Sequence, residues 1–460
     1  MSNYELIIGL EVHVELSTKS KMFCRCDADY FGKKPNTQTC PVCLGLPGAL
    51  PYINEQAIKD CIKIGLALNC EISKDSRFER KNYFYPDLPK GYQISQYRWP
   101  LCIKGWIEVV GKNGATSKIR INRVHQEEDT AKLVHQLGIS NFKFPISNEQ
   151  KLTLIDFNRS GVPLVEIVSE PDFRDVEEVR DYAKKLQQIF RYLGVSNADM
   201  ERGDMRLEAN ISLREIQNSK SEIRNDELPN YRVELKNINS FRFMIAAIEF
   251  EIKRQTEELE SGRILKQETR GWDENSKKTY LQRSKEEAHD YRYFPDPDLP
   301  PILLEEFQIS NIKSQIPELP EKKLERFKSE YKLSSYDVEI ITREREMADY
   351  YEEGVKIGKE FEVTPKQIVD YIINKKVNID EVLPAKLVQA IKSALQVVAI
   401  DMGELERIIN QVIEENQKAV GDYKAGKEAA IMFLVGQVMR RFKEKTDAKI
   451  VKEKIEEQIR

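Results

Sequence analysis

The sequence predicts an α+β fold, with an antiparallel sheet first and helices after it, on three observations. Short runs of alternating apolar and polar residues recur through the first two-thirds of the 460 residues, and regular helices rarely separate them. Strands that follow one another in this way favour an antiparallel sheet over a doubly wound parallel one. Further along, strand signals nearly vanish and the chain is helical by period and by Lys, Glu and Leu content.

The expected strands lie within residues 1–294. They are Tyr4–Leu16, Trp106–Val110, Lys118–Val124, Leu152–Phe157, Val162–Val168, Met205–Leu213 and Arg232–Asn237. Two helices are expected among them, Asn54–Leu68 and Asp175–Leu193. The second has apolar residues at helical spacing behind a Pro-Asp start signal.

A proline-rich stretch, Tyr293–Pro301, marks the end of this body and reads as a stiff connector. The helices expected after it are Lys322–Glu330, Ser335–Glu353, Thr364–Asn374, Pro384–Val397, Gly403–Glu414, Ala425–Lys443 and Ala448–Ile459. With a second boundary near 400–403, we expect domains at 1–294, 295–402 and 403–460.

The composition, with 32% charged and 40% hydrophobic residues, is that of a soluble globular protein. A net charge of −4 argues against a simple polyanion-coating protein, but a local nucleic-acid surface stays possible. The longest apolar runs, such as Ala429–Val438, are too short to span a membrane, and the N-terminus lacks a secretory pattern. We therefore expect a cytoplasmic protein with no membrane partner.

The first strand separates an apolar face from a polar one, because side chains alternate along a strand. The apolar face is Ile8, Leu10, Val12, Val14 and Leu16, and the polar face is Gly9, Glu11, His13 and Glu15. Two carboxylates therefore flank an imidazole. A solvated polar face is the alternative interpretation.

Other strands also carry charged groups. Glu166 interrupts the apolar run VPLVEIV, where a carboxylate must be paired or metal-bound. Arg206 and Glu208 share a face of Met205–Leu213. The segment RVHQEEDTAKLVH gathers acids and a histidine at an expected strand-to-helix junction, namely His125, Glu127, Glu128 and Asp129.

Acids and arginines on one sheet face suit phosphoryl transfer from a Mg–nucleotide, in which oxygen ligands hold Mg²⁺ and cations neutralise phosphates. Scattered ion pairs on a solvated face remain the alternative. The run Arg77–Pro100 interleaves basic and aromatic residues, which suits a nucleotide or a single-stranded RNA end, although a structural hairpin explains it nearly as well. We expect the nucleotide to be bound by Lys81, Lys90, Arg159 and Arg206.

Cysteines cluster near the N-terminus in the pattern Cys24-x-Cys26, thirteen residues, Cys40-x-x-Cys43. Four thiolates at such spacing predict a structural, tetrahedral Zn²⁺ site, with reduced structural thiols as the alternative. His13-x-Glu15 before Cys40-x-x-Cys43 is similar to a zinc-deaminase signature, but Thr39 replaces the expected proline.

Several long segments in one order resemble a known family. They are IGLEVHVEL, RKNYFYPDLPKGYQISQY, RVHQEEDTAKLVH, IDFNRSGVPLVEIVSEPDFR and EEAHDYRYFPDPDLPP, and the likeness continues at FLVGQVM. Together they resemble the B subunits of bacterial aspartyl/glutamyl-tRNA(Asn/Gln) amidotransferases.

The resemblance implies a heterotrimeric ligase of protein biosynthesis. Its B subunit would use Mg–ATP to phosphorylate the side-chain carboxylate of Glu-tRNA(Gln), Asp-tRNA(Asn) or both. Ammonia, made from glutamine by an amidase-type A subunit and delivered through an internal channel, would then displace the phosphate. A small C subunit would belt the other two together.

The resemblance also implies a cradle-shaped, glutamine-synthetase-like catalytic body, a helical domain and a YqeY-like tail, the last two binding tRNA. It places the catalytic residues and Mg²⁺ ligands on His13, Glu11, Glu128 and Glu166, with Glu208 as a further ligand. Lys445–Lys449 reads KTDAK where the family has a GKANP-type stretch, and the final segment is short. Since only some members carry the cysteines, zinc rests on their spacing alone.

Two other functions compete with this one. One is an RNA-binding module whose acidic face is only structural; Glu166 argues against it, since a pure binder has no reason to place a carboxylate in an apolar strand. The other is a stand-alone ligase of the glutamine-synthetase kind, which would act without tRNA or partners.

Overall fold

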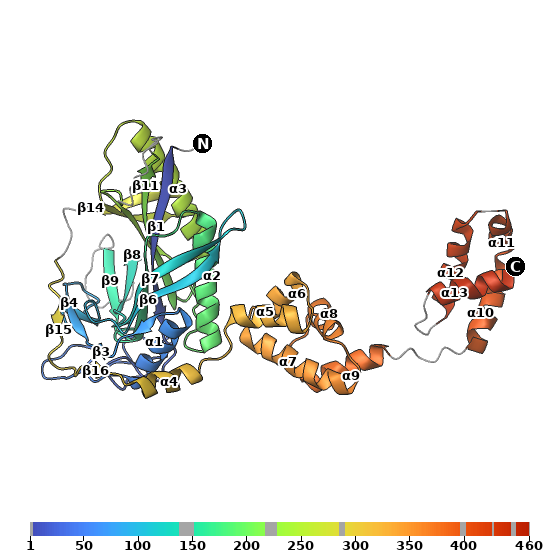
Figure 1. Ribbon diagram of the computed structural model, residues 1–460, viewed down its shortest axis with the longest axis horizontal. Helices are drawn as coiled ribbons and strands as arrows, with labels where there is room; N and C mark the ends of the chain where they lie inside the picture. The colour runs from blue at the N-terminus through green and yellow to red at the C-terminus, as the bar shows by residue number, and fades with distance from the viewer. Residues whose placement is uncertain are drawn as a thin grey trace. The chain divides into compact units, whose positions relative to one another are not determined.

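The computed structural model describes residues 3–137, 151–216, 228–284, 290–395, 402–425, 427–442 and 448–459. The chain divides into two compact units (Figure 1). The first is Met1–Glu325 with Arg343–Arg345, and the second is Arg326–Thr342 with Glu346–Arg460.

A nine-stranded sheet organises the first unit, in the order β14-β13-β12-β11-β1-β10-β7-β6-β2. Every neighbouring pair is antiparallel except β12 with β13. The antiparallel body expected from the sequence is therefore confirmed. The strands are β1 (Tyr4–Glu15), β2 (Glu71–Ile72), β6 (Cys102–Val110), β7 (Thr116–Glu128), β10 (Pro163–Ser169), β11 (Met205–Glu215), β12 (Val233–Ile238), β13 (Glu268–Asp273) and β14 (Lys278–Ser284).

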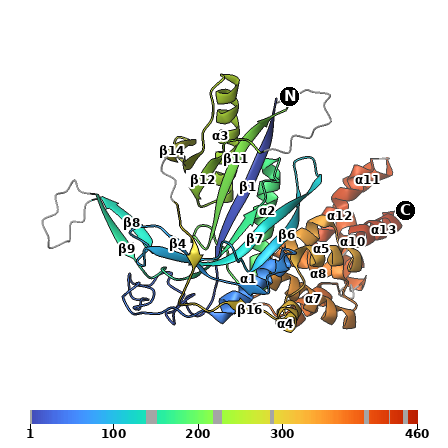
Figure 2. The same ribbon diagram turned by 60° about the vertical axis from the view of Figure 1, so that its left-hand side comes forward.

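Three small sheets complete the strand content of the described chain. They are β3 (Asp75–Ser76) with β16 (Ile302–Leu303), β4 (Glu79–Asn82) with β5 (Tyr92–Ser95) and β15 (Phe294–Pro295), and the hairpin β8 (Lys132–Leu137) with β9 (Lys151–Asp156). The hairpin extends away from the main sheet (Figure 2).

The expected strand-to-helix junction after Asp129 is wrong, because β8 follows β7. A run as short as AKLVH does not reveal its period, and pairing with β9 from Lys132 opposite Asp156 onwards decides its conformation.

Helices α1 (Glu55–Ala67), α2 (Val176–Leu193) and α3 (Phe241–Glu260) contact one face of the main sheet. The apolar face of β1 is buried against them in one hydrophobic core. A capping box at Asp175 starts α2, and Gly194 at φ 66 ends it. The polar face of β1 thus points away from the helices, which leaves it available for a site.

The proline-rich stretch packs on the body and is not a free connector. Phe294 pairs with Arg80 of β4 at a sheet edge, a position that tolerates the following proline. Asp296, whose side chain is fully buried, accepts a hydrogen bond from Arg80 Nε at 2.7 Å.

The remaining helices confirm a helical C-terminal part. They are α4 (Glu306–Ser314), α5 (Pro320–Glu330), α6 (Ser335–Ile341), α7 (Arg345–Glu360), α8 (Pro365–Lys375), α9 (Pro384–Leu395), α10 (Met402–Glu415), α11 (Gln417–Lys424), α12 (Ala429–Arg441) and α13 (Ala448–Ile459). Helices α10 to α13 share a hydrophobic core of their own. No helix of the described chain is long and apolar enough to cross a bilayer.

Two expected helices have the wrong bounds. Ser335–Glu353 is interrupted between α6 and α7, where Arg343 and Glu344 lie outside the helices; both of these residues and Arg345, the first residue of α7, contact α2. Ala425–Lys443 begins later than expected, because Lys427 N bonds to Asp422 O at 3.0 Å in a turn that separates α11 from α12. Most of Lys445–Lys449 lies outside the described residues.

Candidate active site and four-cysteine cluster

A row of three charged side chains crosses three neighbouring strands. In the sheet register His13 of β1 pairs with Glu166 of β10, which pairs with His125 of β7. Glu166 Oε2 lies 3.7 Å from His13 Nε2 and 3.2 Å from His125 Nε2. The expectation that a carboxylate in this apolar run must be paired is confirmed.

Glu127 joins this row, because it lies two residues beyond His125 on the same side of β7. Its carboxylate is 3.4 Å from His125 Nε2 and accepts hydrogen bonds from Ser95 Oγ at 2.5 Å and Gln93 Nε2 at 3.2 Å. Donor atoms of His13, Glu127 and Glu166 all lie within 4.8 Å of one another. We call these three residues the imidazole cluster.

A second group of acids lies beside it. Glu11 of β1 is opposite Glu208 of β11, and atoms of Glu11, Glu208 and Glu234 lie within 4.8 Å of one another. Lys236 Nζ contacts Glu208 at 2.9 Å and Glu234 at 3.2 Å. We call these three acids the carboxylate cluster.

Both clusters contribute to one cleft of about 870 Å³. Its walls combine acids, cations and tyrosines, which is the mixture that an anionic ligand with a divalent cation requires. The residues that line it and enter the argument below are Glu11, Glu127, Glu166, Glu234, Lys81, Lys236, Arg123, Tyr97, Tyr291 and Tyr293.

The electrostatics of the cleft favour a cation. Burial opposes a charged His13, but the hydrogen bond and charge of Glu166 outweigh it and raise the pKa of His13 to about 9. Burial also opposes a charged Glu166, but His125 and His13 hold its pKa well below the ordinary value. Burial, followed by the charges of Glu166 and Glu208, raises the pKa of Glu11. In the structure, bound protons and the amine of Lys236 offset the negative charge of these acids. A bound metal ion could offset the same charge.

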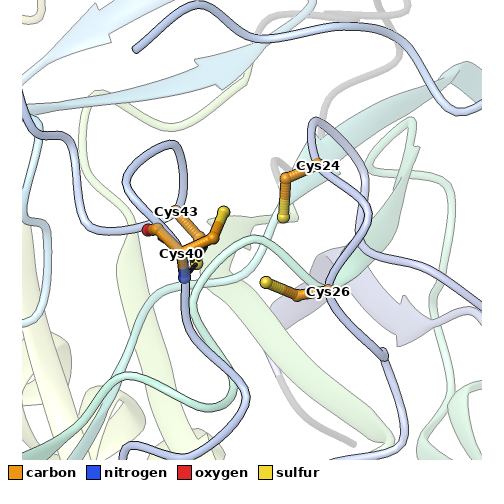
Figure 3. Close-up of side chains that lie close together, drawn as sticks. All are labelled: Cys24, Cys26, Cys40 and Cys43. Atoms are coloured by element: carbon orange, nitrogen blue, oxygen red, sulfur yellow. Dashed lines mark hydrogen bonds between the residues drawn. The ribbon is translucent and has the colours of Figure 1, made fainter.

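The four cysteines meet in a separate cluster built from two loop segments (Figure 3). The Sγ atoms of Cys24, Cys26, Cys40 and Cys43 lie within 4.8 Å of one another, and those of Cys40 and Cys43 are 3.8 Å apart. Tetrahedral Zn–S bonds of about 2.3 Å place sulfurs about 3.8 Å apart. The cluster therefore fits a metal ion.

Contacts of Lys21 and of the loop before β10 hold this cluster in place. Lys21, which is fully buried, lies with Nζ 3.8 Å from Cys43 Sγ and donates to Gln38 O at 2.7 Å and Phe157 O at 3.4 Å. Ser160 Oγ donates to Cys43 O at 3.0 Å. The loop before β10 is thereby tied to the cysteines.

Two family models match the chain: the GatB/GatE catalytic domain over residues 6–310 and the GatB domain over 362–459. Curated relatives match it almost end to end, and each is named as the B subunit of aspartyl/glutamyl-tRNA(Asn/Gln) amidotransferase. The Thermodesulfovibrio yellowstonii protein is 44% identical over 98% of both chains. That of Carboxydothermus hydrogenoformans is 42% identical over 100% of this chain and 99% of its own, and that of Thermotoga maritima is 43% identical over 97% of both.

The chain belongs to the family of aspartyl/glutamyl-tRNA(Asn/Gln) amidotransferase B subunits. The resemblance drawn from its motifs is confirmed, and with it membership of a family of amidotransferase components. The matches span both the sheet-bearing part and the helical end of the chain.

In this member of the amidotransferase family, Glu128 lies apart from the imidazole cluster. Adjacent strand residues point to opposite faces, so Glu127 and Glu128 diverge. The Glu128 carboxylate pairs with Lys90 and accepts a hydrogen bond from Ile94 N at 3.0 Å. The structure thus brings together His13, Glu166 and Glu127, while Glu128 and Lys90 bind each other.

Arg159 and Arg206 also point elsewhere. Both contact Asp129, with Arg159 Nε 3.7 Å from its carboxylate, and Arg206 also reaches Glu15 at 3.2 Å. Of the four cations expected to bind the nucleotide, the described cleft includes Lys81 alone. Lys81 lies 5.0 Å from the centre of the Tyr291 ring.

Sequence reasoning did not assign several cleft residues, namely His125, Glu127, Glu234 and Lys236. The segment RVHQEEDTAKLVH, with its histidine and acids, was a signal for the first two. A signal also existed for the last two, because Arg232, Glu234 and Lys236 alternate with Val233 and Leu235 along an expected strand. The face they share is the cleft face, as their place in its lining shows.

Proposed function

We propose that this chain is the B subunit of a heterotrimeric amidotransferase that acts on Glu-tRNA(Gln), Asp-tRNA(Asn) or both. It phosphorylates the side-chain carboxylate of the charged amino acid with ATP. Ammonia, released from glutamine by an amidase-type A subunit and led through an internal channel, then displaces the phosphate. A small C subunit completes the complex. Full-length similarity to proteins of that name supports this assignment.

The observation that carries the catalytic part is the imidazole cluster beside the carboxylate cluster in one cleft. A carboxylate is a poor acyl donor, since its oxide is a poor leaving group; phosphorylation supplies a good one. Mg²⁺ held by oxygen and imidazole ligands would neutralise the charge of the ATP phosphates. We assign His13, Glu127 and Glu166 as its ligands, and Glu11 and Glu208 as further ligands.

We assign to Glu127 the role that the sequence suggested for Glu128. Glu127 has its carboxylate within 4.8 Å of the donors on His13 and Glu166, whereas the Glu128 carboxylate is engaged by Lys90. The ion pair between Glu128 and Lys90 then has a structural role next to the site. Lys81, beside the cleft tyrosines, is the nucleotide-binding cation among the four expected ones.

We also propose that the four-cysteine cluster binds structural Zn²⁺. A set of four thiolates closes the coordination sphere, so it leaves no position for a reactant. Metal analysis of the purified chain tests this, and a preparation without bound zinc would contradict it.

We propose a division of labour along the chain. Residues 1–294 form a glutamine-synthetase-like catalytic cradle, 295–402 a helical domain, and 403–460 a YqeY-like tail that binds tRNA. The separate hydrophobic core of α10 to α13 supports an independent tail. Basic side chains in this tail, among them Arg440 and Arg441 at the end of α12, suit an RNA backbone.

The test is release of phosphate from ATP by the assembled complex with Glu-tRNA and ammonia. We expect release to require aminoacyl-tRNA and to fall about 100-fold or more in His13→Ala and Glu127→Gln. Full activity in both variants would overturn the site assignment. Activity with free glutamate and without partners would indicate a stand-alone ligase, and RNA binding with no ATP use would indicate a binding module.

A further inference from the structure

Arg123 is a cleft cation that forms no ion pair with a carboxylate of the described residues. It lies on β7 two residues before His125, on the same side of the strand, and it lines the cleft. Within the described chain it makes one hydrogen bond, from Nη1 to Asn122 Oδ1 at 3.4 Å, and its buried Nε has no partner there. Lys236 and Lys90 differ, because each is paired with glutamate.

Aromatic rings hold this guanidinium in place. Its central carbon lies 5.4 Å from the centre of the Tyr97 ring, and that ring stacks on Tyr293 at 4.7 Å with 17° between the planes. Tyr97 N donates to the fully buried Glu79 at 2.8 Å, which fixes the tyrosine backbone. Stacking orients a guanidinium but leaves its N–H groups free to donate.

The position of Arg123 relative to the imidazole cluster suits a phosphoryl group. Two residues along a strand cover about 7 Å, which is within reach of an arginine side chain. A guanidinium offers planar, paired donors that match phosphate oxygens. Arg232 and Arg292, by contrast, are exposed at the rim of the cleft.

We propose that Arg123 binds the γ-phosphoryl group of ATP during its transfer, and that Tyr97 is the positioning residue that orients Arg123. The inference rests on the proposed function. In the step it serves, the bond between the γ-phosphorus and the bridging oxygen breaks and its electron pair leaves on ADP. A bond forms between that phosphorus and a carboxylate oxygen of the aminoacyl group, with no proton exchanged. Arg123 stabilises the charge on the moving group.

The test compares two ligands of the assembled complex by calorimetry, Mg–ADP and Mg–ADP with aluminium fluoride, which mimics the moving phosphoryl group. We expect Arg123→Ala to weaken binding of the fluoride complex about 100-fold and to leave Mg–ADP nearly unchanged. Arg123→Lys and Tyr97→Leu should fall between it and the wild type, and Tyr97→Phe should match the wild type. Arg120→Ala is the matched control, since Arg120 is on β7 but pairs with Asp172 at 2.7 Å.

Each outcome separates this inference from the proposed function. Unchanged binding of the fluoride complex in Arg123→Ala, or equal weakening of both ligands, would overturn the role of Arg123 while ATP use stands. Failure of the wild type to bind either nucleotide would overturn ATP use itself, and this inference with it. Turnover gives a second readout, because loss of a transition-state contact lowers kcat and leaves KM for ATP nearly constant.

Discussion

Of the clusters of described residues that could hold a cation, the imidazole cluster and the four-cysteine cluster differ in almost every physical respect. The imidazole cluster comes from strands of one sheet, and its register sets which side chains meet. The four-cysteine cluster comes from loops between β1 and α1 and is held by Lys21 and Ser160. One offers a few hard ligands to an open cleft, and the other offers four soft ligands that face one another.

The proposed function gives each cluster a different role. An open site with acids and free cations nearby lets phosphate oxygens complete the coordination of a cation, which is what a reaction requires. Four thiolates around one metal ion would cross-link the two loop segments that carry them. In the proposed function, the cysteines stabilise the loop before β10, and the strands of the main sheet carry the chemistry.

The largest expected effect on turnover is at Glu166 of the imidazole cluster. Glu166→Gln removes the charge shared by His13 and His125, so we expect ATP-dependent phosphate release to fall about a thousandfold. Thermal unfolding of the variant checks that the sheet is intact. Near-normal turnover in a folded variant would contradict a catalytic role of the imidazole cluster.

A second experiment compares the roles of two adjacent residues, Glu127 and Glu128. Glu127→Gln should lower kcat about 100-fold, because it removes a ligand from the cleft. Glu128→Gln should leave kcat within about tenfold and destabilise the fold by about 2 kcal/mol, because the partly buried Lys90 loses its charged partner. Phosphate release and denaturant unfolding measure both. The reverse ranking in kcat would return Glu128 to the active site.

Changes in the four-cysteine cluster should lower stability more than they lower kcat. Cys43→Ser should lose the bound zinc and lower Tm by several degrees, while kcat of the folded fraction drops less than tenfold. Cys70→Ala, a buried cysteine outside the cluster, is the control and should retain zinc. A zinc-free Cys43→Ser protein with an unchanged Tm would show that the cluster does not stabilise these loops.

The smallest effect expected is a pH dependence in buffer without added divalent cations. His13 has a folded pKa of about 9 against an ordinary 6.5, so its protonation stabilises the folded state fully below pH 6.5. That contribution is lost as pH rises towards 9. The Tm difference between wild type and His13→Gln should therefore shrink over that range. A difference that grows with pH would contradict the pairing of His13 with Glu166.

The sequence predicted the fold best where a pattern was local and long. Period-two alternation in Tyr4–Leu16 predicted both faces of β1, and the apolar run around Glu166 predicted a paired carboxylate. Short or weakly patterned segments were missed or misread, including β8, whose conformation depends on a partner strand that is distant along the chain. The break between α6 and α7 was missed for a similar reason, since its residues contact α2.

The sequence predicted the type of ligand that the candidate site would bind, but not which residues would form the site. The residue types and their strand faces pointed to a cation and a phosphate. Lys90, Arg159 and Arg206 looked equivalent to Lys81 in the sequence, but distant carboxylates engage those three and leave Lys81 in the cleft. Pairing of charges across strands depends on register, which composition and spacing do not specify.

By itself, the sequence determined the class of fold, the family, the polar face of β1 and the four cysteines that fit a metal ion. The three-dimensional structure was needed to show that Glu127 and not Glu128 joins His13 and Glu166, and that Arg123, beside them, forms no ion pair with a described carboxylate. Alternation of apolar and polar residues and the spacing of ligands are properties of short stretches of chain, so they can be recognised in the sequence. The neighbours of a side chain on the next strand are set by hydrogen-bonded register and by packing between residues far apart in sequence.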